Sequence, residues 1–494
     1  MQGSAMRRRK LALPVAALAV LAVVAGVLVW LLPGRAAAKL VGPSSPRVAQ
    51  AEAARAVSGA RTVAVTLTAA ATTADIGGRT VQTWAFNDTV PGPTIRLTAG
   101  DVVRATVVNR LPEPLTVHWH GIALRNDMDG VPDVTQAPIA PGGTFTYEFT
   151  AATAGTYFYH SHVGTQLDRG LYGPLVVDDR APASADPDVP LLLDDWLDGT
   201  GTTPDEAFKG LRSMGGSGSG SSMAGMDMGS MPGMDMGSSG TDPNNPLGTD
   251  TADLTYPAYL VNGRTPDAPA VYPVAAGQQV RLRLINAAAA TPFRVAFGAG
   301  QMTVVATDGY PVTPVQTDSL LIGMGERYDV LVTAPATGTA ALVAAAEGKS
   351  GQAMAVLRTG DGPLPSADVR PTGLQAAPLP YSSLRATPAV ALPDAKPDVS
   401  YTVGLTGDMM SYNWGLNVPK SRGATLPVKQ GQRVRLVLKN DTTMWHPMHL
   451  HGHTAQLLTD SGPGPRKDTV VVPPKSTVTL EFVADNPGQW LLHC

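Results

Sequence analysis

All nine histidines of this 494-residue chain fall into four short clusters. In a strand, residues i and i+2 point to the same side, so each His-x-His places two imidazoles on one face. Unrelated surface or core histidines would not share this spacing, and the pattern indicates a centre for several metal ions. The clusters are His118/His120, His160/His162, His446/His449/His451/His453 and the single His493.

Three stretches of the chain share one frame: "LTAGDVVRATVVN" (97–109), "VAAGQQVRLRLIN" (274–286) and "VKQGQRVRLVLKN" (428–440). Each has a glycine, Val-Arg three and four residues later, and an asparagine five residues after the arginine. The alternating apolar residues after the glycine indicate a strand that leaves a turn. The repeat predicts three copies of one β-domain, at 59–180, 186–365 and 395–494.

The register of the repeat shows which copies carry the histidines. "HWHG" (118–121) and "HLHG" (449–452) begin nine residues after the asparagine of copies one and three. Copy two has Val295 and Phe297 at these places. We expect copy two to be a spacer that holds its neighbours so that their His-x-His pairs face one another.

The end of the printed sequence parallels the end of copy one. "GQWLLHC" (488–494) aligns with "GTYFYHSH" (155–162), so that His493 matches His160 and Cys494 matches a serine. The repeat therefore predicts histidine as the residue after Cys494, and a sequence that stops inside a His-x-His.

The only cysteine, Cys494, and the neighbouring histidines suggest which metal is bound. One cysteine cannot form an internal disulfide. His446 and Cys494 occur only in copy three, where copy one has Leu115 and Ser161. A thiolate with imidazole suits copper in a trigonal His₂Cys site with a weak axial ligand. Zinc would accept the same donors, but eight imidazoles poised around several ions fit copper redox chemistry better. Electrons could then pass along the backbone from Cys494 to His493.

Composition favours an all-β protein. Gly (52) and Pro (43) are frequent, and many short Val/Thr-rich runs lie between turn residues. The net charge is −3, and no basic run appears outside the N-terminus. Because nucleic-acid binders need a basic patch, we expect no nucleic-acid partner.

Residues 1–40 precede the fold as an anchor or export segment. "MRRRK" (6–10) comes before an uncharged apolar run at 11–32, which is long enough to span a bilayer with its basic flank in the cytoplasm. A long cleavable signal peptide, with "RAAAK" (35–39) as the cleavage region, explains the same residues, and the arginine pairs permit twin-arginine export. Either interpretation predicts a protein outside the cytoplasm, membrane-anchored or secreted.

Together, "HWHG", "HSH", "HPMHLHGH", "HC" and "PGPTIR" (91–96) resemble the multicopper oxidases, with laccases and copper-efflux oxidases as the nearest types. The resemblance covers residues 60–494 and implies three cupredoxin domains, each a Greek-key β-sandwich. It also implies four copper ions per complete chain: one type 1, one type 2 and two type 3. By this likeness His446 and Cys494 bind the blue type 1 copper, His118 and His449 bind type 2, and His120, His160, His162, His451 and His493 bind the type 3 pair.

The family pattern continues beyond the printed sequence. It runs His-Cys-His, then three residues, then a second blue-copper histidine and an axial Met or Leu. His453 has no ligand role in the pattern and is expected to be a supporting or structural histidine.

Two carboxylates match acids of the family. Asp129, in "NDMDG" (126–130), matches one that helps to deliver protons to oxygen, although Asp-Gly is also an ordinary turn signal. Asp468, in "PRKDTVVV" (465–472), matches one that hydrogen-bonds the blue-copper histidine at the substrate edge, although it could be a turn residue before a strand.

A methionine-rich tract, 213–240, interrupts copy two. Its low complexity indicates disorder, and a solvated linker is the simplest interpretation. Yet seven of the 17 methionines lie here, and thioethers are soft donors that select Cu(I). The tract resembles methionine-rich segments of copper-resistance oxidases and predicts capture of Cu(I) by Met223, Met226, Met228, Met231, Met234 and Met236, besides Met214.

Three functions compete on these residues. The first is an oxidase that couples four one-electron oxidations, of Cu(I) or phenols, to reduction of O₂ to two waters. The second is a copper-sequestering protein without turnover, which would not need four His-x-His pairs and a unique cysteine. A copper nitrite reductase is disfavoured, because it would not need the paired type 3 histidines.

Overall fold

The computed structural model describes residues 40–180, 187–214, 242–248, 251–252, 254–408, 412–418 and 424–494. The chain divides into two compact units, 1–41 and 42–494, and the helices and strands described below belong to the second. Among the described residues no helix has the length and apolarity to cross a membrane. The predicted anchor or signal run at 11–32 and the six methionines predicted to capture Cu(I) lie outside the described residues, so both stay predictions.

The three repeated stretches form three equivalent strands. These are β4 (Val102–Asn109), β12 (Gln279–Asn286) and β22 (Arg433–Asn440), each eight residues long. The glycine before each strand has φ between +65° and +90°. Glycine adopts this left-handed conformation without steric cost, which explains its place in the repeat.

The asparagine that ends each strand closes the same loop in all three copies. Asn109 donates to the carbonyls of Glu113 and Ile139, both at 2.8 Å, and accepts the N–H of Leu111 at 2.9 Å. Asn286 and Asn440 make the corresponding bonds. All three are buried, so each side chain satisfies backbone groups that water does not reach.

The first β-sandwich consists of two four-stranded sheets, whose side chains share one core that includes Leu67, Val103, Val117 and Leu175. In strand order the sheets are β2 (Arg79–Phe86), β1 (Thr62–Ile76), β4 and β6 (Thr144–Thr150), and β3 (Ile95–Thr98), β8 (Tyr172–Asp178), β7 (Gly155–Ser161) and β5 (Val117–His120).

The second β-sandwich has a six-stranded and a five-stranded sheet around the largest group of buried apolar side chains. The first sheet runs β10 (Ala258–Val261), β9 (Asp188–Trp196), β12, β17 (Arg327–Thr333), β14 (Met302–Thr307) and β15 (Tyr310–Thr317). The second runs β11 (Ala270–Pro273), β19 (Gln352–Thr359), β18 (Gly338–Ala346), β13 (Phe293–Phe297) and β16 (Leu320–Ile322).

The third β-sandwich has a six-stranded and a three-stranded sheet among the described residues. The first runs β21 (Gly415–Asn417), β20 (Val399–Thr406), β22, β27 (Thr477–Val483), β24 (Ala455–Thr459) and β25 (Gly462–Lys467). The second runs β26 (Thr469–Val472), β23 (His446–Leu450) and β28 (Leu492–His493).

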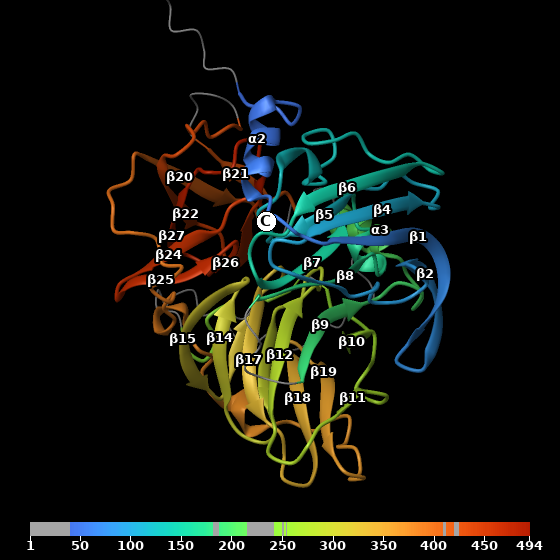
Figure 1. Cartoon of the computed structure of the whole chain (residues 1–494). Coiled ribbons are helices and arrows are strands. Elements are labelled where there is room, and N and C mark those ends of the chain that lie inside the picture. Colours follow the sequence, from blue (N-terminus) through green and yellow to red (C-terminus); the bar gives the residue numbers. More distant parts are fainter. Residues whose placement is uncertain are drawn as a thin grey trace, which may run out of the picture. The chain divides into compact units, whose positions relative to one another are not determined.

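The prediction of a mostly β chain with three related domains is confirmed. Strands of the three sandwiches fall inside the three predicted ranges, whose bounds stay predictions. Among the described residues the longest helices are α2 (Pro46–Arg55) and α3 (Pro204–Met214). Figure 1 shows the first sandwich in blue to teal, the second in green to orange-yellow and the third in orange to red, with the C-terminal end beside β5 and β7.

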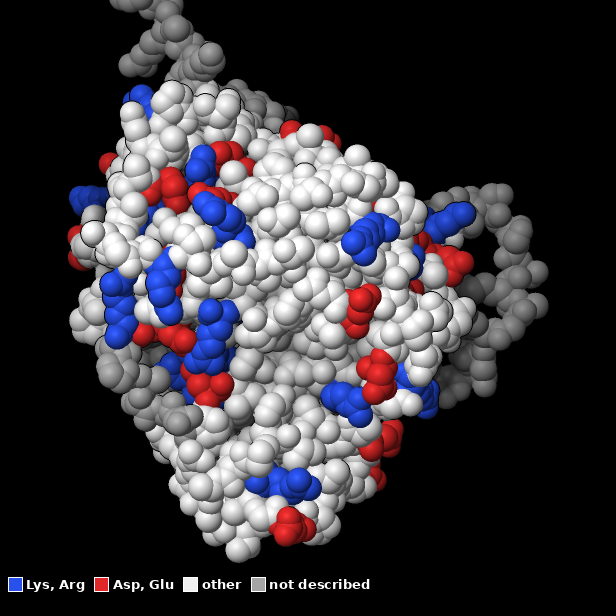
Figure 2. All heavy atoms as spheres, turned by 45° about the vertical axis from the view of Figure 1, so that its right-hand side comes forward, with Lys and Arg blue, Asp and Glu red and all other residues white. Residues whose placement is uncertain are grey.

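Charged side chains are mixed on the surface. On the face in Figure 2, the Lys and Arg side chains of the described residues lie among Asp and Glu side chains. Exposed pairs such as Arg104 with Glu148 contribute little to stability, because water screens them. The chemistry of the molecule lies in its buried histidines.

Candidate metal centre

Two pairs of strands place the histidines of the first and third sandwiches in matching positions. β5 and β7 are antiparallel, with His118 directly opposite His160. β23 and β28 are antiparallel, with His449 directly opposite His493. Directly opposite residues project on the same face of a sheet, so each sandwich presents imidazoles from both strands on one side. This is the arrangement that the repeat predicted.

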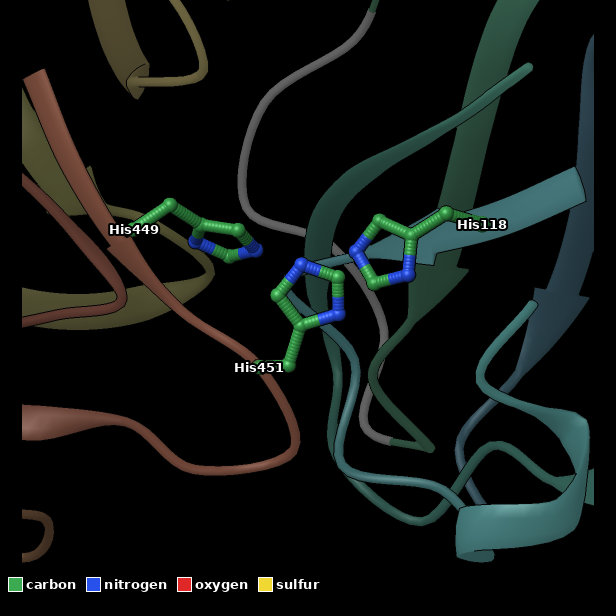
Figure 3. A group of neighbouring side chains, drawn as sticks. All are labelled: His118, His449 and His451. Carbon is green, nitrogen blue, oxygen red and sulfur yellow. The ribbon is translucent and has the colours of Figure 1, made fainter. Parts of the chain in front are cut away.

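The two sets of imidazoles meet between the first and third sandwiches. The ring centroids of His118 and His451 are 3.9 Å apart, and those of His120 and His449 are 3.8 Å apart and nearly parallel. Figure 3 shows His118 on one side of the site and His449 and His451 on the other, with their rings turned toward one another. Seven predicted cluster ligands thus converge: His118, His120, His160, His162, His449, His451 and His493.

His118 and His449 are oriented by equivalent hydrogen bonds. His118 Nδ1 donates to the carbonyl of Asp129 at 2.8 Å, and His449 Nδ1 donates to the carbonyl of Asp468 at 3.0 Å. The Nε2 atoms of both rings are buried without a hydrogen-bond partner among the described residues. With His451 they offer ligand atoms within 4.8 Å of one another. Unpartnered buried nitrogens that converge in this way fit a metal ion.

Further donor groups complete the cluster. His162, His451 and His493 also offer ligand atoms within 4.8 Å of one another, and His451 Nε2 lies 3.0 Å from His493 Nε2. His118, His120 and His160 form another such group. Several overlapping imidazole triplets in one buried volume suit more than one metal ion, with nitrogen donors that copper accepts.

Burial keeps these imidazoles neutral, which is the form that binds metals. It holds the pKa of His120, His160 and His451 well below the ordinary value, and nearby imidazoles add to the effect. Burial likewise lowers the pKa of His162 to about 2 and that of His493 to about 4. At neutral pH no proton has to leave these rings before a metal ion binds.

We expect each of these histidines to make the copper-free protein less stable in acid. An unfolded histidine gains a proton near pH 6.5, but folded His162 stays neutral, so the free energy of unfolding falls as the pH falls below about 6.5. Buried acids with raised pKa, such as Asp194, act in the opposite direction. The test therefore compares the native protein with His162→Gln in denaturant titrations between pH 7 and 5. As the pH falls, the free energy of unfolding should fall less steeply in the variant, by roughly 1.4 kcal/mol per pH unit. An equal pH dependence in both proteins would contradict the prediction.

The structure brings His446 and Cys494 together at the edge of the cluster. Cys494 Sγ lies 3.9 Å from His446 Nδ1, and the His446 ring packs edge-on against Trp414. Both side chains line a hollow of about 260 Å³ with Leu405 and Leu416. Burial lowers the pKa of His446 to about 4, so this imidazole is also neutral at neutral pH.

Asp129 lies inside the cluster. Its Oδ2 accepts a hydrogen bond from His451 Nδ1 at 2.9 Å, and its Oδ1 is 3.4 Å from His118 Nδ1. Oδ1 is buried and has no hydrogen-bond partner among the described residues. The carboxylate joins a histidine of the first sandwich to one of the third. Its role in proton delivery stays a prediction.

Asp468 is buried beside two imidazoles of the cluster. Its side chain is 1% exposed and lies 3.5 Å from both His120 Nε2 and His449 Nδ1. Burial would raise the pKa of Asp468, but Arg327 outweighs burial and holds the pKa well below its usual range. The location of Asp468 at a substrate edge and its part in catalysis both stay predictions.

Arg327 could not be recognised from the sequence, since it is 141 residues from Asp468 and belongs to the copy without histidines.

His453 was expected to have no ligand role. It packs against Phe482 and Trp490, and its Nε2 accepts the N–H of Asn486 at 3.4 Å.

Comparison with known proteins identifies the family. Models described as multicopper oxidase match residues 68–182, 238–362 and 394–494. The multicopper oxidase MmcO of Mycobacterium tuberculosis is 46% identical over 90% of this chain and 86% of its own. The chain belongs to the multicopper oxidase family. Its sandwiches are the cupredoxin-like domains of that family, and it is a copper-dependent oxidoreductase that reduces O₂.

Two further proteins are similar to this chain over most of their length. The copper resistance protein A homolog of Pseudomonas syringae pv. tomato is 31% identical over 87% of this chain and 89% of its own. The solved structure of the laccase from Botrytis aclada superposes with a TM-score of 0.69, at 27% identity, over 88% of this chain and 85% of that one. Both a copper-resistance protein and a laccase are thus among the relatives.

Proposed function

We propose that this multicopper oxidase takes single electrons from Cu(I) at His446 and Cys494 and reduces O₂ to two waters at the seven-histidine cluster. Phenols are the second substrate class. The observation that carries the proposal is the convergence of neutral, buried imidazoles from two sandwiches, with unpartnered Nε2 atoms on His118 and His449.

The donor sets support four copper ions. His446 and Cys494 would hold the type 1 ion, and His118 and His449 the type 2 ion. When bound, copper supplies the reversible one-electron chemistry that the side chains lack. The type 3 pair would be held by the remaining members of the cluster, His120, His160, His162, His451 and His493.

The chain positions these groups and connects them. The peptide between Cys494 and His493 is the shortest covalent connection from the thiolate to the cluster. Burial excludes bulk water from the imidazoles, and their fixed hydrogen bonds orient the rings. Reduction of one O₂ to two waters consumes four electrons and four protons. We infer that the Asp129 carboxylate takes up and passes these protons, because its Oδ1 has no hydrogen-bond partner among the described residues and its two oxygens lie beside His118 and His451.

The printed chain contains soft donors suited to Cu(I). The methionines of 213–240 offer thioethers, and the P. syringae relative is named for copper resistance. The apolar run at 11–32 supports a location outside the cytoplasm, membrane-anchored or secreted, where excess copper would be met. A copper store without turnover would use the same donors, and measured turnover separates the two functions.

Deleting residues 215–240 should slow oxidation of Cu(I) and leave oxidation of a phenolic dye nearly unchanged. The deletion spares helix α3, which ends at Met214. A methionine tract should act on delivery of cuprous ion, because thioethers bind Cu(I) and have no affinity for a phenol. The measurement is the rate of both oxidations at equal copper content.

A replacement tract in which serine stands for each methionine is the matched control for length. It should behave like the deletion. Equal loss of both activities would assign the tract a part in folding, and no change in either would make it a passive linker.

A further inference from the structure

One arginine of the second sandwich contacts all three sandwiches. The Arg327 side chain is fully buried at the start of β17. Its Nε donates to the carbonyl of Thr156 in β7 of the first sandwich at 3.1 Å. Its Nη1 donates to the carbonyl of Gly325 in its own sandwich at 3.0 Å. Nη1 and Nη2 each donate to one carboxylate oxygen of Asp468 in the third sandwich at 2.6 Å.

The carboxylate of Asp468 also faces the cluster. Asp468 Oδ1 lies 3.5 Å from His120 Nε2 and 3.5 Å from His449 Nδ1. Asp468 Oδ1 also accepts a hydrogen bond from the Thr469 hydroxyl at 3.0 Å. That hydroxyl lies 3.1 Å from His120 Nε2 and 3.1 Å from His449 Nδ1. Arg327 and the two imidazoles therefore contact the same short segment, Asp468 and Thr469.

Two glycines leave the space for this arrangement. A side chain at Gly121, which follows His120, would place its Cβ 2.1 Å from Arg327 Nη2 and 2.7 Å from Asp468 Oδ2. A Cβ at Gly325 would lie 3.0 Å from His120 Cε1. Both glycines also have φ above +80°. The backbone thus lets the guanidinium and the imidazole approach where any other residue would collide.

We propose that Arg327 is a positioning residue for the copper cluster, acting through Asp468 on His120 and His449. Two parallel charge-assisted hydrogen bonds fix the plane of the carboxylate as well as its place. A buried ion pair is by itself weak evidence for stability, since apolar residues of the same volume often serve as well. Here the paired carboxylate also lies 3.5 Å from an imidazole of the first sandwich, His120, and from one of the third, His449. The second sandwich, without a ligand of its own, thereby sets the geometry of the cluster.

The test compares Arg327→Met with a matched buried arginine. Arg283 is also buried at the boundary of the first and second sandwiches, pairs with Asp188 and Asp329, and contacts the Thr156 hydroxyl at 2.9 Å. Its hydrogen bonds and ion pairs with the described residues are to Asp188, Thr156, Asp329 and Asp178, and none is to a histidine. Arg283→Met therefore removes a similar ion pair without reaching the cluster.

The proposal rests on the proposed function, and copper-loaded holoenzyme is used throughout. For Arg327→Met we expect kcat for O₂ reduction to fall roughly 10- to 100-fold, as loss of an outer contact to a metal ligand does. The electron paramagnetic resonance signal of type 2 copper should change, while the blue band and KM for the donor stay the same. Arg283→Met should change stability alone. Equal kinetic losses in both variants, or an unchanged type 2 signal in Arg327→Met, would overturn the proposal.

Two further substitutions, made singly and together, decide the case where Arg327→Met does not fold. Arg327→Lys keeps the charge but cannot make two parallel bonds, so it should show the same spectral change with a smaller loss of kcat. Asp468→Asn and the double variant with Arg327→Lys should lose activity to the same extent, because both residues act as one unit. Additive losses would contradict the proposal. Failure of the proposed function itself would be visible in the unaltered protein, as absence of O₂ uptake.

Discussion

Replacing Cys494 with serine should abolish the blue colour of the copper-loaded protein and its oxidation of every donor. The thiolate is the ligand that gives a type 1 site its intense absorption, and the chain has no other cysteine to replace it. Cys494 is bonded to His493, and its Sγ lies beside His446. Loss of the thiolate therefore also removes the ligand through which electrons would leave the type 1 copper for the cluster. Visible absorbance and oxygen uptake of the protein, as its gene encodes it, check the prediction.

Both readouts are needed, because they separate the two roles of Cys494. The seven cluster histidines do not depend on the thiolate, so the variant should still bind copper of type 2 and type 3. A Cys494→Ser variant that kept the blue band would show that the assignment of His446 and Cys494 is wrong.

Replacing His120 with alanine should have the opposite effect: the blue band persists while O₂ reduction collapses. His120 is buried against His449, with ring centroids 3.8 Å apart, and belongs to a donor triplet with His118 and His160. The loss should exceed the roughly 10- to 100-fold that removal of an outer contact costs, because a ligand itself is gone. His446 and Cys494 lie in another group of side chains, so their copper should remain.

His453→Gln is the matched control. His453 is a buried histidine two residues after His451, but it packs against Phe482 and Trp490 and is absent from the donor triplets. We expect this variant to retain oxygen uptake and the blue band. Normal oxygen uptake in His120→Ala would contradict the ligand assignment.

The imidazole cluster could be predicted from the sequence because its causes are local and repeated. A period of two puts His118 and His120 on one face of β5, and His449 and His451 lie at the end of β23. The shared register of the asparagine and the His-x-His then shows that two copies are alike and that the second lacks ligands. Asn109 and its counterparts make the same loop contacts in each copy, which is why the repeat is visible at all.

The contacts between sandwiches could not be predicted in this way. Nothing in the spacing shows that His118 packs against His451, or that Arg327 reaches Asp468 across 141 residues. The resemblance matched Asp468 to an acid at a substrate edge, but it gave no sign of the buried ion pair with Arg327. One signal was available: the glycine after His120, Gly121, marks a place where a side chain would collide with Arg327.

The most direct test of the central claim is the number of electrons used per O₂. The unaltered, copper-loaded protein oxidises a one-electron donor in an oxygen electrode, and catalase is added when uptake slows. If the seven histidines hold a cluster that makes water, four donors are oxidised for each O₂ consumed, and catalase releases no oxygen. Two donors per O₂ with oxygen released by catalase, or copper bound without any oxygen uptake, would contradict the account.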